Sequence, residues 1–101
     1  MLQRQLERLS VAGMQLLSLP DISTHYVFER AGFAALVART PEGFGSVGSA
    51  GLLTAGGFAA LVWRGGQPCF VRKGVDLPAS AAQVEALRAF ASDLEQALRA
   101  D

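Results

Sequence analysis

The 101-residue sequence predicts a single α+β domain over residues 1–101, with one helix, a four- to five-stranded antiparallel meander and a closing helix packed on the sheet. Apolar residues recur at helical spacing at both ends of the chain and at a period of two between them. The connections between the strand-like segments are too short for parallel crossovers, which need a dozen or more residues. Half of the residues are hydrophobic, a composition typical of a globular domain.

The N-terminal apolar pattern predicts a helix over residues 2–17. Its stripe contains Leu2, Leu6, Leu9, Gly13 and Leu16. Gly13 weakens this helix, because glycine is a poor helix former, and Pro20 with Asp21 is expected to end it.

The C-terminal apolar pattern predicts a second helix over residues 81–99. Ser80 and Gln83 have the spacing of a capping box, in which each side chain bonds the backbone N–H of the other residue. Glu95 and Arg99 form a favourable pair on the exposed side. The stripe that faces the sheet contains Val84, Leu87, Phe90, Leu94 and Leu98.

The segments between the helices are rich in β-branched and aromatic residues, which favour strands. The expected strands cover residues 25–30, 33–39, 47–54, 58–64 and 69–75, and the third is the weakest. The links contain glycine, proline or both, which indicates antiparallel hairpins. Residues 31–39 and 56–64 match at all but two positions, which either an internal duplication or convergence on a good strand explains.

Gly43, Gly45 and Gly48 have the G-x-G-x-x-G spacing of phosphate-binding loops. The glycines that follow prevent the helix such a loop needs, and neither the carboxylate of a dinucleotide fold nor the lysine of a kinase loop is in place. We therefore interpret the stretch as a turn that leads into a strand. Gly43 and Gly45 are expected to take positive φ, and Gly48 and Gly51 to mark a bulge or close backbone packing.

His25 and Cys69 are the only histidine and the only cysteine, so together they are the minimum for a thiol enzyme. A meander places the first and last strands at opposite edges of the sheet, so we expect no such pair and no enzyme activity. The single cysteine excludes a thiolate zinc site within one chain. We expect no metal and no cofactor.

Nine basic and nine acidic residues give a net charge of zero, which provides no field to attract nucleic acid or anionic lipid. The basic residues of the strand region are interleaved with Trp63 and Phe70, as on an RNA-binding sheet, but they fit edge protection equally well. These residues are Arg39, Arg64, Arg72 and Lys73. Because no signal peptide or membrane-spanning stretch stands out, we expect a cytoplasmic protein. Eight arginines against one lysine, with abundant Ala and Gly, suggest a bacterial source.

The segments 33–37 and 58–62 are apolar at every position, so both faces of their strands should be covered. The second face requires the first helix, a curl of the sheet into a partial barrel, or a second copy of the chain. The interface candidates are Ala34, Leu36, Ala59, Leu61 and Trp63. We expect a small non-enzymatic domain that acts through protein–protein association with itself, as a homodimer, or with another protein. The alternative is a small-molecule-binding or regulatory module with an apolar pocket between sheet and helices.

Overall fold

The computed structural model describes residues 2–19, 22–54 and 57–99, without the side chains of Leu2, Gln3 and Ser23. Pro20 and Asp21, which were expected to end the first helix, lie outside the described residues. The same holds for residues 55–56 of the expected turn before the 58–64 strand.

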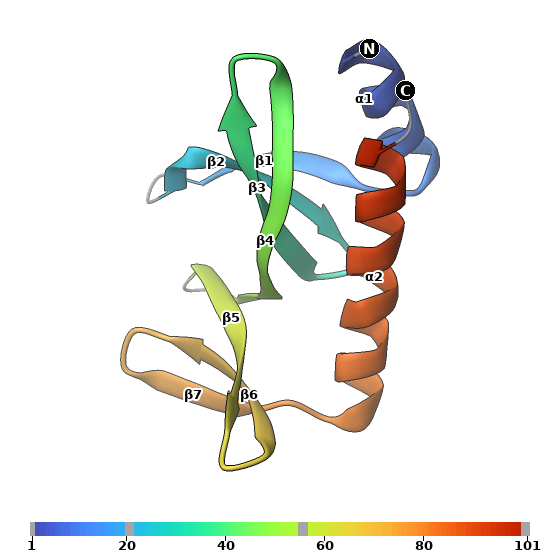
Figure 1. Cartoon of the computed structure of the whole chain (residues 1–101). Helices are drawn as coiled ribbons and strands as arrows, with labels where there is room; N and C mark the ends of the chain where they lie inside the picture. The colour runs from blue at the N-terminus through green and yellow to red at the C-terminus, as the bar shows by residue number, and fades with distance from the viewer. Residues whose placement is uncertain (1, 20–21, 55–56, 100–101) are drawn as a thin grey trace.

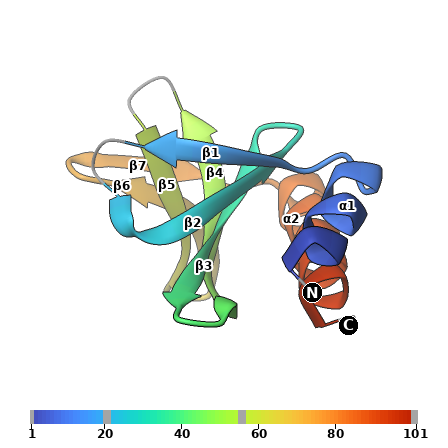
Figure 2. The same ribbon diagram turned by 90° about the horizontal axis from the view of Figure 1, so that it is seen from above.

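The described residues form an α+β fold with seven strands between two helices, so the class is confirmed and the expected four or five strands are too few. Each strand pairs antiparallel with the next one along the chain, so the sheet is a simple meander. Both helices lie on one side of the twisted, curled sheet (Figures 1 and 2). The elements are α1 (Leu2–Val11), β1 (Gln15–Leu19), β2 (Ile22–Arg30), β3 (Phe33–Thr40), β4 (Gly43–Thr54), β5 (Gly57–Arg64), β6 (Gln67–Arg72), β7 (Val75–Pro78) and α2 (Ala81–Arg99).

The predicted extension of the first helix to residue 17 is wrong, because α1 ends at Val11 and residues 15–19 form β1. Gly13 has a φ of 80° and ends the helix in a Schellman motif. Its N–H bonds the Ser10 carbonyl at 3.0 Å, and the Met14 N–H bonds the Leu9 carbonyl at 2.9 Å. Leu9 and Met14 both join the buried core, which completes the hydrophobic contact of this motif.

The predicted last strand, 69–75, is two strands. Lys73 and Gly74 form a two-residue turn between β6 and β7, with Arg72 paired to Val75. Gly74 has a φ of 76°, which a turn of this length accommodates and a continuous strand does not. The chain therefore reverses where the sequence pattern predicted an extended segment.

The glycine-rich stretch 43–51 belongs to β4, which pairs with β3 on one side and β5 on the other. Gly43 has the expected positive φ, 124°, whereas Gly45 does not, so that expectation is wrong. Gly48 lies in a bulge, because two residues of β4 face the single residue Leu36 of β3 between regular pairs. A second irregularity near Gly45 bends the same strand again.

Helix α2 covers the predicted range, and its capping box is confirmed. The Gln83 N–H donates to the Ser80 hydroxyl at 3.1 Å, and the Ser80 N–H donates to the Gln83 side-chain oxygen at 2.9 Å. The expected pair of Glu95 and Arg99 forms at 3.6 Å. The buried residues of α2 are Val84, Leu87, Phe90, Leu94 and Ala97.

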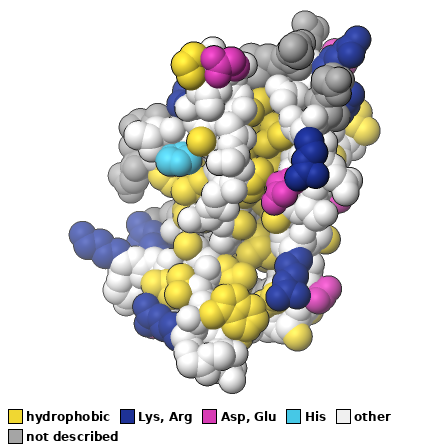
Figure 3. Space-filling model, in the orientation of Figure 1, with side chains coloured by type: hydrophobic (Ala, Val, Ile, Leu, Met, Phe, Trp, Pro, Cys, Tyr) yellow, Lys and Arg dark blue, Asp and Glu magenta, His cyan; other side chains and the backbone are white. Residues whose placement is uncertain are grey.

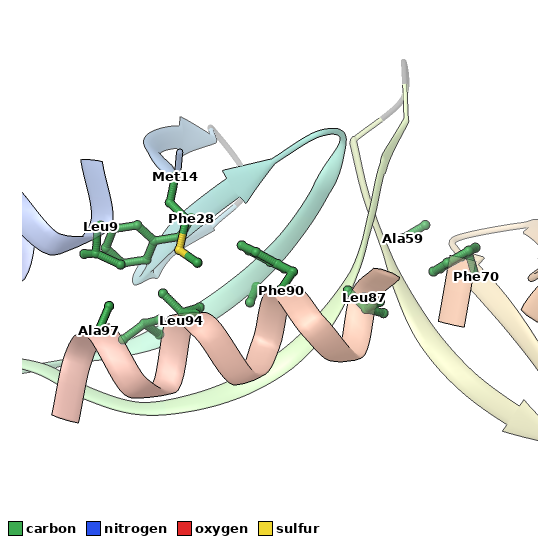
Figure 4. Close-up of a cluster of buried hydrophobic side chains, with 11 residues drawn as sticks. Leu9, Met14, Phe28, Ala59, Phe70, Leu87, Phe90, Leu94 and Ala97 are labelled. Atoms are coloured by element: carbon green, nitrogen blue, oxygen red, sulfur yellow. The ribbon is translucent and has the colours of Figure 1, made fainter. Parts of the chain in front are cut away.

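The core lies between α2 and the sheet face that α2 covers (Figure 4). Leu9 and Met14 lie beside Phe28 at one end, and Leu87 points towards Ala59 and Phe70 at the other. Burial of such large apolar side chains contributes roughly 1.5–3 kcal/mol each.

Arg30 fixes α2 to the first half of the sheet. Its Nη1 lies 3.0 Å from the Asp93 carboxylate and donates to the Ala12 carbonyl at 3.2 Å. Its guanidinium also lies 5.5 Å from the centre of the Phe90 ring. One side chain therefore joins β2, α2 and the link between α1 and β1.

Candidate protein-association surface

The strand register divides the five interface candidates between the two faces of the sheet. Leu52 of β4 pairs with Phe33 on one side and with Ala59 on the other, so these three side chains share a face. Ala59 is part of the core under α2, so this is the helix face. Gly51 likewise pairs with Ala34 and Ala60, which therefore lie on the opposite face.

The register thus places the candidates of the two matching segments on different faces. Ala34 and Leu36 lie on the opposite face, whereas Ala59, Leu61 and Trp63 lie on the helix face. A shift of one residue in pairing moves every side chain to the other face. The two matching segments are therefore offset by one position in the sheet, and equivalent residues such as Phe33 and Phe58 point in opposite directions.

The opposite face is partly covered by the chain itself. Val27 is 1% exposed and Ala34 is 0% exposed, although both helices lie on the other side of the sheet. The curl of the sheet encloses these side chains, which corresponds to the partial-barrel alternative. Ala59 is also buried, so neither alanine offers surface to a partner, and Leu36 is only half-buried.

The exposed apolar surface lies instead on the helix face, over the last three strands. α2 packs mainly on β4 and β3, and its Leu87 also reaches Ala59 of β5 and Phe70 of β6. Trp63 is 53% exposed, Val75 46% and Leu77 39%. Leu77 pairs with the core residue Phe70, which places it, with Val75, on the same face as Trp63. We call Trp63, Pro68, Val84, Glu85 and Arg88, which line one groove, the Trp63 surface.

A groove of about 400 Å³ runs through this surface, between the β5–β6 hairpin and the first turns of α2. Trp63 pairs with Pro68, whose carbonyl accepts a 3.0 Å hydrogen bond from the Ala79 N–H. This bond positions the start of α2 beside the indole. Figure 3 shows hydrophobic side chains gathered there, with charged side chains beside them along α2.

Glu85 and Arg88 give the groove one charge of each sign. Within the chain they form a loose pair at 4.0 Å, with side chains that are 78% and 66% exposed. An exposed pair of this kind contributes about 0–1 kcal/mol and exchanges partners readily. Both charges therefore remain accessible to another molecule.

The two residues of the candidate thiol pair, His25 and Cys69, lie on strands that are not neighbours in the sheet. His25 lies on β2 and Cys69 on β6, with β3, β4 and β5 between them. His25 Nδ1 is 2.8 Å from the Thr24 hydroxyl, and the Cys69 thiol is 4.0 Å from the Gln67 carbonyl.

The basic residues of the strands are distributed over different places instead of forming one platform. Arg39 lies over the Tyr26 ring, 4.3 Å from its centre. Arg64 forms a salt bridge with Asp76. Arg72, at the other end of the β5–β6 hairpin, lies beside Gly57. Their separation gives no continuous basic track for a nucleic-acid backbone.

Within residues 2–19, 22–54 and 57–99, no three His, Cys, Asp or Glu side chains are grouped closely enough to hold a metal ion. Neither α1 nor α2 is long and apolar enough to cross a membrane.

Val75 and Leu77 are exposed apolar residues of the helix face that sequence reasoning missed. They were assigned to the end of a strand or to a loop, because the turn at Lys73 and Gly74 was not recognised. The signal was present in the alternation of Val75 and Leu77 directly after a glycine.

Comparison with protein-family models, curated proteins and solved structures finds no match for the chain.

Proposed function

We propose that this chain is a non-enzymatic domain that acts through protein–protein association and forms a homodimer through the Trp63 surface. The observation that carries the proposal is the half-exposed indole of Trp63, which lines a groove together with Pro68 and the first turns of α2. Six large apolar side chains are exposed among the described residues, and three of them, Trp63, Val75 and Leu77, lie on the helix face of β5 and β7. Tryptophan is enriched among the residues that dominate binding energy at interfaces.

A second copy of the chain is the occupant that the charges of the surface favour. In a two-fold interface each contact occurs twice, so a surface must complement itself. Glu85 and Arg88 meet this requirement, since the carboxylate of one copy faces the guanidinium of the other on both sides of the axis. The apolar residues of the two Trp63 surfaces exclude water where they meet and supply the binding energy. The Glu85 and Arg88 charges fix the orientation of one copy relative to the other.

Sedimentation equilibrium over micromolar concentrations tests this proposal. We expect the wild-type chain to be dimeric and Trp63→Ala to be monomeric with an unchanged circular dichroism spectrum. Leu16→Ala is the matched control, because Leu16 is 49% exposed but lies on β1, far along the strand order from Trp63. It should remain dimeric. A monomeric wild-type chain at 100 micromolar would refute the homodimer.

In the alternative, a small-molecule-binding or regulatory module, the same groove is the ligand pocket. Its volume of about 400 Å³ falls within the range of ligand pockets, and an aromatic ring with a few polar groups is a common lining. This alternative predicts that compounds from a metabolite library raise the melting temperature of the wild-type chain but not of Trp63→Ala. The homodimer predicts concentration-dependent melting without any added compound.

A further inference from the structure

We draw no further inference here: the strongest candidate, the open groove along α1 that is lined by Arg4, Glu7, Arg8, Val11 and Ala12, carries nothing, because its described lining comes from one helix and the residue after it, and nothing in the described part of the chain shows what covers it.

Discussion

Gly51 of β4 lies directly against the carbonyl oxygen of Ala59 on β5. A Cβ atom at position 51 would overlap this oxygen and would lie 2.8 Å from the Cα atom of Ala60. Because those atoms belong to the backbone, they cannot move aside as a side chain would. The contact therefore requires glycine at this position, where β4 pairs with the second of the two matching segments.

Gly51→Ala should lower the free energy of unfolding by about 3 kcal/mol, because the new methyl group must push two paired strands apart. Urea unfolding measures this change. Gly48→Ala is the matched control, since its Cβ would lie 3.6 Å from the Leu36 carbonyl, an ordinary contact. It should change the stability by less than about 1 kcal/mol. Equal effects of the two substitutions would contradict the close approach.

Ala31→Asn should raise the free energy of unfolding by about 0.5–1 kcal/mol. Among the described residues, Ala31 is the only non-glycine residue with a positive φ. Asparagine tolerates this conformation better than alanine does. Its side chain is exposed, so no packing changes. Thermal unfolding measures the effect, and Ala31→Val should be destabilising because a β-branched residue strains the turn further. A stabilising valine would show that backbone strain does not limit this hairpin.

Glu85→Arg and Arg88→Glu should each weaken the proposed dimer about tenfold, because each places like charges opposite one another twice. The double variant, which exchanges the two charges, should restore the wild-type dissociation constant. Sedimentation equilibrium at low salt gives all four values. Both residues are exposed, so unfolding of the monomer should change by about 0.5 kcal/mol or less. A double variant as weak as the single ones would rule out the two-fold contact between these charges.

Local signals were sufficient for much of the fold. The capping box of Ser80 and Gln83 and the apolar stripe behind it predicted α2 over residues 81–99, as observed. Capping and helical periodicity involve residues a few positions apart, so a short stretch of sequence is enough to predict them. The short glycine-containing links likewise predicted an antiparallel meander, which the strand order confirms.

The wrong boundaries came from glycines whose role depends on the surrounding chain. Gly13 was interpreted as a weak point inside a helix, but it ends α1, because Leu9 and Met14 pack together in the core. Gly74 was placed in a strand, but it turns the chain between β6 and β7. In each case a glycine is compatible both with the interior of an element and with its end, and the packing of the surrounding chain decides between the two.

The sequence by itself determined the α+β class, the closing helix, and the presence of apolar residues on both sides of the matching segments. Only the tertiary structure decided which of those residues share a face. β4 lies between the two segments and pairs Phe33 and Ala59 through Leu52, so Trp63 lies on the helix face and Ala34 on the other. Alternation gives each strand two faces, but the register between strands is a long-range property. It depends on turns, bulges and the approach of Gly51 to Ala59, which no single segment contains.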